Sequence, residues 1–217
     1  MGYHLGVDMS VWQRVTNAKQ IYRSLMALSG KTEPFCFLND ADPTFGEKYA
    51  ALHAAGFAGH IALYHYVTDT PIIDQIVHTL GLPFSCPVAW DDEVQYGRTW
   101  EQIKDDGILA RDMTFKAKRR FATYTNEWFE ESTGGLPRPL WLASPGTYPS
   151  TECLVWQKSW TATVDGIEGE VDLDQWMGND ASFRSFWRVA KPEERVPGQL
   201  TPDDVKGTWT TTFEAKP

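Results

Sequence analysis

The sequence has few cysteines, no long apolar run and a deficit of positive charge. Its 217 residues include 3 cysteines without a CxxC pair, which predicts buried reduced thiols and disfavours a disulfide scaffold or a zinc site. No apolar run reaches the roughly 20 residues of a bilayer span, so we expect no membrane insertion. Lys and Arg total 20 against 29 Asp and Glu, a formal net charge of −9. This balance argues against nucleic-acid binding.

Several motifs of well-known chemistry are also missing. The chain contains no GxGxxG or GxxxxGK[ST], no HExxH and no GxSxG, so nothing predicts a nucleotide, a zinc ion or a serine nucleophile. We therefore expect no cofactor and no metal. The opening MGYHLGVDMS lacks a basic patch followed by an apolar stretch, which predicts that there is no secretory signal.

Aromatic residues, in contrast, are abundant. They make up 13% of the chain and include 10 tryptophans. Tryptophan and tyrosine suit a large core, and they also provide the flat faces on which sugar rings lie. Composition alone leaves both interpretations open.

The first half of the sequence alternates strand-like runs with helical patterns, and the second half does not. Strand-like runs at 4–9, 34–38, 60–67 and 87–93 are each followed by apolar residues at helical spacing. After Phe121 the pattern changes: further strand-like runs follow one another through connections with Gly and Pro and little helical periodicity, at 122–125, 139–143, 154–160 and 171–176.

This change predicts an α/β fold, an irregular TIM-like barrel with β-α units first and bare β-strands last. A doubly wound layer explains the second half less well. We expect the barrel within 1–190, and the Pro-containing segment 191–217 to be a linker or tail.

Acidic residues gather where the predicted strands end, which is where barrel enzymes place their chemistry. Asp8 ends the first strand, Asp91, Asp92 and Glu93 end the fourth, and Asp172 lies in a late strand. Because side chains alternate along a strand, Asp91 and Glu93 are predicted to share one face. Asp92 then points toward the helical layer, where it needs a polar partner.

Two carboxyl groups on one strand face suit glycoside hydrolysis, in which one acid delivers a proton and another is ionised. Crowding and burial raise the pKa of one member of such a pair. Two other interpretations stay open: the acids hold Mg²⁺ or Ca²⁺, or they are solvated loop residues.

Six ordered segments resemble the glycoside hydrolase family 25 lysozymes, the Chalaropsis-type muramidases that include many phage endolysins. The segments are GVDMSVWQ at 6–13, GHIALYHYV at 59–67, AWDDE at 89–93, ATYTNEW at 122–128, PLWLAS at 139–144, and LVWQ with GIEGEVDLDQW within 154–176. The resemblance implies a flattened barrel of about five β-α units followed by bare strands. It also implies cleavage of the β-1,4 bond between N-acetylmuramic acid and N-acetylglucosamine in a peptidoglycan glycan strand.

Residue by residue, the resemblance makes Glu93 the proton donor and Asp91 its partner carboxylate, with Asp8 and Asp172 as further acids of the site. The resemblance also implies that Tyr64, Tyr124 and Trp141 line the sugar groove. Tyr148, in the unusual segment 144–151, is a further candidate for sugar binding. The chain departs from the family after its second strand, where FLNDADP replaces a Lys and a Glu-Gly. It also departs at Asp92, because most members have an apolar residue at the middle position of this D-x-E motif.

Three functions fit these residues. The first is a muramidase, a phage endolysin held in the host cytoplasm before its release to the cell wall. The second is a carbohydrate-binding protein without turnover, and the third is a metal-dependent hydrolase. The negative net charge gives no attraction to an anionic wall, so capture would depend on the groove or on a separate cell-wall-binding domain or subunit.

Overall fold

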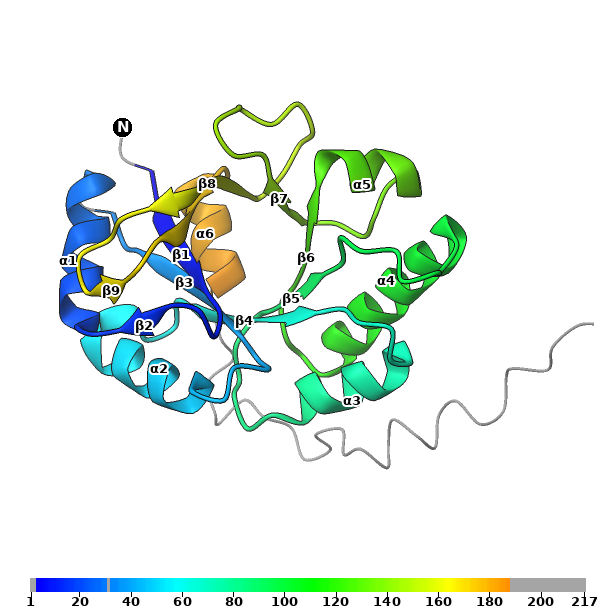
Figure 1. Cartoon of the computed structure of the whole chain (residues 1–217), viewed down its shortest axis with the longest axis horizontal. Coiled ribbons are helices and arrows are strands. Elements are labelled where there is room, and N and C mark those ends of the chain that lie inside the picture. The colour runs from blue at the N-terminus through cyan, green and yellow to red at the C-terminus, as the bar shows by residue number, and fades with distance from the viewer. Residues whose placement is uncertain (1–2, 31, 188–217) are drawn as a thin grey trace, which may run out of the picture.

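The chain folds into a closed barrel of eight strands with helices around its outside (Figure 1). A computed structural model describes residues 3–30 and 32–187, so the predicted tail 191–217 lies outside the described residues. Around the barrel the strands follow the order β1-β10-β8-β7-β6-β5-β4-β3. Their bounds are β1 Leu5–Met9, β3 Phe35–Asn39, β4 Ile61–Tyr66, β5 Val88–Asp91, β6 Phe121–Asn126, β7 Leu140–Ala143, β8 Val155–Ala162 and β10 Val171–Trp176.

Five β-α units come first, as the family resemblance implies; apolar spacing in the sequence predicts the first four of their helices. The helices that follow strands β1, β3, β4, β5 and β6 are α1 Ala18–Leu28, α2 Phe45–Leu52, α3 Ile72–Gly81, α4 Trp100–Lys116 and α5 Glu127–Thr133. A π-helical turn, His53–Phe57, extends α2. A capping box of Thr99 and Gln102 opens α4, because each side chain accepts a hydrogen bond from the other residue's backbone N–H.

The second half contains the predicted bare strands and two helices that the sequence pattern did not reveal. The connection from β7 to β8 contains no helix, and β10 runs antiparallel to both of its neighbours. The missed helices are α5, of 7 residues, and α6 (Asp180–Trp187), of 8 residues. Each has only about two turns, too few to show a helical period. A small ribbon of β2 (Arg14–Val15) and β9 (Ile167–Glu168) lies beside the barrel.

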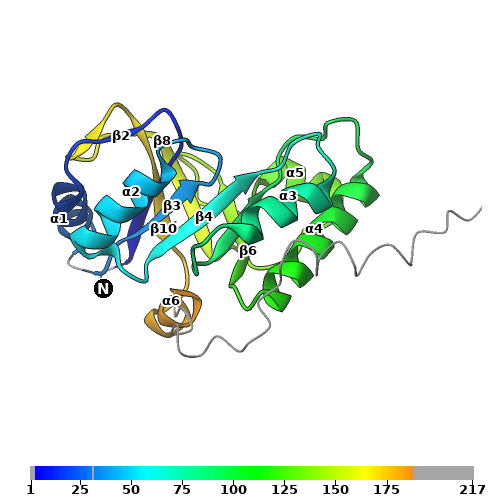
Figure 2. The ribbon, with the colours of Figure 1, turned by 90° about the horizontal axis from the view of Figure 1, so that it is seen from below.

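Alternation along the strands separates two apolar layers. Outward residues of β1, such as Val7 and Met9, pack on α1 and α2. The barrel interior instead combines large rings with alanines, such as Phe37 and Trp141 with Ala89, so that the bulky groups fill a flattened barrel. Helix α6 closes the end that lies opposite the carboxyl ends of the parallel strands (Figure 2). The ring of its Phe183 contacts that of Phe35.

The core position of α1 gives the first testable prediction. Leu25 is fully buried in the layer between α1 and the barrel. We expect Leu25→Ala to lower the free energy of unfolding by about 2–5 kcal/mol, because the change removes buried methyl groups and leaves a cavity. Leu28 on the same helix is 55% exposed, so Leu28→Ala is the control. Equal losses in urea denaturation would contradict this packing.

The described residues agree with the expectation of reduced cysteines. All three cysteines are free thiols, with Cys36 and Cys86 buried and Cys153 partly exposed. No helix among residues 3–30 and 32–187 is long and apolar enough to cross a bilayer.

Candidate functional site

The predicted acids meet at one rim of the barrel. Strands β1 and β3 to β8 are parallel, so their carboxyl ends share this rim, and antiparallel β10 begins there. Asp8 lies near the end of β1, paired with Asp172 at the start of β10. Asp91 ends β5, and Glu93 follows it at the rim. The structure therefore brings all four acids to the same end of the barrel.

Asp91 and Glu93 are set off from Asp92, as alternation predicts. Asp92 points into the helical layer, where its Oδ1 accepts a hydrogen bond from Arg98 Nη2 at 2.7 Å. The polar partner predicted for Asp92 is thus Arg98. Asp91 instead joins the barrel interior, where its Oδ1 is buried and has no hydrogen-bond partner among the described residues.

The surroundings of the two inward carboxyls favour their protonated forms. Burial and the nearby charges of Glu93 and Asp92 raise the pKa of Asp91 well above its usual value. Burial also raises the pKa of Glu93, while a hydrogen bond with Asn126 opposes that shift. Because two neighbouring carboxyls resist ionising together, this pair retains a proton to higher pH than isolated acids do.

Gln157 of β8 connects the other two acids. Its Nε2 donates to Asp8 Oδ2 at 2.8 Å and to Asp172 Oδ2 at 3.3 Å, and its Oε1 accepts from Tyr124 OH at 2.9 Å. Burial, followed by the charge of Glu93, raises the pKa of Asp172 to about 6. Gln157 was missed in the sequence because a lone glutamine in a strand carries no chemical signature.

Asp174 is a further residue of the site that was not predicted from the sequence. It is fully buried, its Oδ1 accepts from Trp141 Nε1 at 2.8 Å, and its Oδ2 has no partner among the described residues. Burial and the charge of Asp172 raise its pKa well above the usual value. The signal was present in EVDLDQW, because residues 172 and 174 share a strand face just as 91 and 93 do.

Two of the predicted sugar-binding aromatics lie at the rim, and two have other places. Tyr64 and Tyr124 are each 8% exposed, and nearby acids add to the effect of burial in raising their pKa values. Trp141 is covered, because Phe37 stacks on it at 4.1 Å between ring centroids. Trp141 therefore donates a hydrogen bond to Asp174 inside the barrel and offers no face to a sugar.

Tyr148 lies away from the acids. It is 69% exposed, its ring contacts Trp156, and it borders a cavity of about 780 Å³ whose lining includes Arg138 and Met177. Because β7 and β8 are parallel, the segment between them runs from the carboxyl end of β7 back to the amino end of β8, opposite the acids. We therefore remove Tyr148 from the candidate site.

The buried acids predict a specific pH dependence of stability. Asp174 has a higher pKa in the folded protein than in the unfolded chain, so its contribution is most favourable below the unfolded value near 4 and is lost as pH rises toward the folded value. We expect Asp174→Asn, which keeps the shape without the charge, to gain stability relative to wild type between pH 5 and pH 7. Urea denaturation at pH 5 and pH 7 measures the free energy of unfolding of both proteins. If the advantage of Asp174→Asn over wild type became smaller from pH 5 to pH 7, the prediction would be contradicted.

The same residues do not form a ready metal site. Among the described residues, no group of three or more His, Cys, Asp or Glu side chains is placed to hold a metal ion.

Comparisons with known proteins identify solved structures that share this fold. No protein-family model matches the sequence, and no curated protein matches it significantly. Solved structures do match. The bacterial lysozyme of Streptomyces coelicolor aligns over 86% of this chain and 97% of its own, with a TM-score of 0.67 and 21% identity. The catalytic domain of endolysin ply40 from bacteriophage P40 of Listeria monocytogenes aligns over 85% and 97%, with a TM-score of 0.68 and 15% identity.

A glycosyl hydrolase 25 of Streptococcus pneumoniae aligns over 84% of this chain and 92% of its own, with a TM-score of 0.62 and 17% identity. The chain has the fold of the glycoside hydrolase family 25 lysozymes. These identities are low, so the likeness concerns the fold. The irregular TIM-like barrel predicted from the sequence is confirmed.

Against this lysozyme fold, the departure after the second strand has a structural explanation. Within FLNDADP, Asp42 accepts a hydrogen bond from buried Lys48 of α2 at 2.5 Å. Lys48 Nζ also donates to the backbone oxygen of Ser10 at 2.6 Å. A lysine from the following helix thus fixes the loop after β1, two residues beyond Asp8.

Proposed function

We propose that the protein is a peptidoglycan hydrolase that cleaves the β-1,4 bond between N-acetylmuramic acid and N-acetylglucosamine. One observation carries the proposal: in a lysozyme fold, a pair of carboxyls with raised pKa values, Asp91 and Glu93, lies at the rim where the parallel strands end. Glycoside hydrolysis needs a carboxyl that is protonated near neutral pH beside other carboxyls.

Glu93 is the member assigned to proton delivery. It is the more exposed of the pair, whereas Asp91 is 6% exposed, so Glu93 reaches substrate more directly. Its proton passes to O4 of the departing N-acetylglucosamine as the bond from that oxygen to C1 of N-acetylmuramic acid breaks. A water molecule then supplies the hydroxyl at C1, and its remaining proton restores the pair.

The other acids respond to the charge that develops on the sugar ring. When Glu93 loses its proton, the site becomes one charge more negative just as the ring becomes positive, and this complementarity lowers the barrier. Asp91 stabilises that charge or orients the acetamido group of the substrate. Asp8 and Asp172, held by Gln157, add negative potential from the opposite wall.

The substrate class is supported by another protein of the same fold. The modular Cpl-1 endolysin has been solved in complex with a peptidoglycan analogue, and 55% of its chain matches 82% of this chain at 15% identity. Endolysin catalytic domains share the fold as well. An endolysin would stay in the host cytoplasm until its release to the cell wall, and a separate wall-binding domain or subunit would help a chain of net charge −9 reach its substrate.

Release of soluble fragments tests the proposal against both alternatives. Purified peptidoglycan is incubated with the protein, with and without EDTA, and new reducing ends are counted. We expect the same release in both. Loss of release in EDTA would favour a metal-dependent hydrolase. Sedimentation with peptidoglycan but no release of reducing ends would favour a binding protein.

A further inference from the structure

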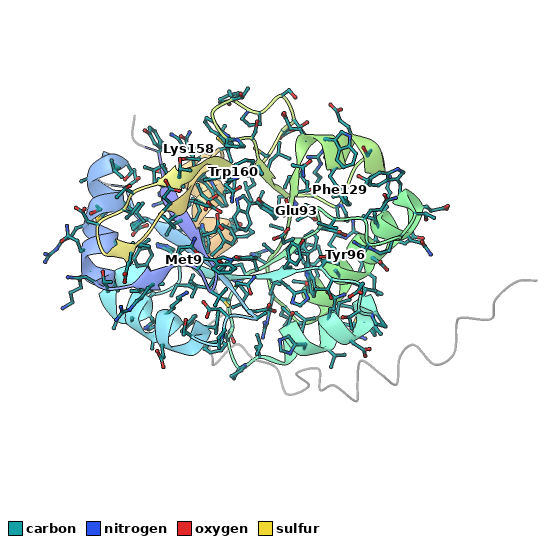
Figure 3. All side chains as sticks on the ribbon, viewed as in Figure 1. Met9, Glu93, Tyr96, Phe129, Lys158 and Trp160 are labelled. Atoms are coloured by element: carbon teal, nitrogen blue, oxygen red, sulfur yellow. The ribbon has the colours of Figure 1, made fainter. Side chains whose placement is uncertain are left out.

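Trp160 is an exposed aromatic residue that is tied to the acids by a hydrogen bond. Its side chain lies on β8 and is 55% exposed, while its Nε1 donates to Gln157 Oε1 at 2.7 Å. Figure 3 labels Trp160, on β8, and Glu93, which follows β5, near the centre of the view. The polar edge of the indole is thus satisfied by the protein, and part of its apolar surface is left to solvent.

An irregularity in β8 aims Trp160 toward the acids. Asp174 pairs with Gln157, and the residue before it, Leu173, pairs with Ser159. One step along β10 therefore corresponds to two steps along β8. In a regular strand, residues 157 and 160 would point to opposite faces. This β-bulge reverses the alternation and brings the indole of Trp160 onto Gln157.

Gln157 links Trp160 to the proposed chemistry. The same amide that accepts from Trp160 donates to Asp8 and Asp172, and the pKa of Asp172 responds to the charge of Glu93. Trp160 is therefore one side chain away from the acids. By contrast, Trp156 of the same strand donates to the backbone oxygen of Ser144 and lies against Tyr148 on the outside of the barrel.

We infer that Trp160 is a sugar-binding platform, on which a pyranose ring of an N-acetylhexosamine polymer stacks beside the acids. This inference rests on the proposed function, because it assumes a glycan strand in the cleft. The C–H face of a pyranose matches the negative face of an indole. The hydrogen bond to Gln157 fixes the indole before the sugar arrives, so little side-chain freedom is lost on binding.

Kinetics on soluble, peptide-free glycan strands of alternating N-acetylglucosamine and N-acetylmuramic acid test the platform. We expect Trp160→Ala to raise KM roughly tenfold, the effect of one lost stacking contact, with kcat changed less than about threefold. Trp160→Phe keeps an aromatic face and should raise KM much less. Phe115→Ala is the matched control, because Phe115 is 50% exposed at the far end of α4 and should leave KM unchanged.

Calorimetric titration of the same strands into each variant gives a readout independent of turnover. If Trp160→Ala binds the strands more weakly than Trp160→Phe does, the platform is supported. This holds even if the wild-type protein cleaves nothing, a result that would contradict only the proposed function. Cleavage by wild type, with KM and Kd unchanged in Trp160→Ala, would overturn the platform and leave the proposed function standing. If Trp160→Ala does not fold, Trp160→Leu replaces it, since leucine keeps apolar bulk without a flat face.

Discussion

Replacing Glu93 with glutamine is expected to reduce the release of peptidoglycan fragments by about 10²–10⁴-fold, the usual effect of losing a general acid. Glutamine has nearly the shape of glutamic acid but cannot donate a carboxyl proton. Because the pKa of Glu93 is raised by burial, removing its charge also removes a desolvation cost. The melting temperature should therefore stay the same or rise. Initial rates and thermal unfolding of the same preparation measure both quantities.

Asp92→Asn provides the opposite pattern and so controls for the Glu93 result. Asp92 is 4% exposed and bonded to Arg98, which also contacts Asp106. Two effects on the stability of this variant oppose each other: Arg98 loses a partly buried partner, but burial raises the pKa of Asp92, so the charge that is removed also carries a desolvation cost. Most activity should remain, since the side chain faces the helical layer. Equal loss of activity in both variants would contradict the assignment of the two strand faces.

Replacing Lys48 with methionine is expected to give the largest change in stability. The Lys48 and Asp42 side chains are 6% and 1% exposed, and breaking such a pair leaves an uncompensated buried charge. Losses of about 3–5 kcal/mol are typical. Although burial alone would raise it, hydrogen bonds from Lys48 and Thr44 hold the pKa of Asp42 below its usual value. The variant should therefore lose most stability above pH 4, where Asp42 is ionised.

Arg111→Met is the matched control for Lys48→Met. Arg111 and Asp112 form an ion pair whose side chains are 34% and 59% exposed, and exposed pairs contribute about 0–1 kcal/mol. Urea denaturation at pH 5 and pH 7 compares the two variants. Similar small losses in both would show that Lys48 is not needed to compensate Asp42.

The sequence was sufficient wherever one local period determined the outcome. Alternation along β5 and the residues that follow it places Asp91 and Glu93 on the inner side and Asp92 against Arg98. The apolar residues at helical spacing after the first strand-like run likewise include Leu25, which is buried in the core. The roles of Glu93, Asp91, Asp8 and Asp172, in contrast, came from the family resemblance and stay predictions.

Features that depend on register or long-range packing could not be predicted. Trp160 reaches Gln157 only because β8 has an extra residue opposite β10, and no local pattern marks that bulge. Trp141 was expected in the groove, but the distant Phe37 covers its ring. Tyr148 was misplaced because a loop without helical or strand periodicity gives no direction.

The chemical identity of the new chain end distinguishes a muramidase from an enzyme that cuts the glycan strand at another bond. Peptidoglycan digested with the protein is reduced with borohydride, hydrolysed and analysed by mass spectrometry, which identifies the sugar at each new reducing end. We expect muramitol from wild type and none above background from Glu93→Gln. Glucosaminitol as the new end, or equal amounts of muramitol from both proteins, would contradict this expectation.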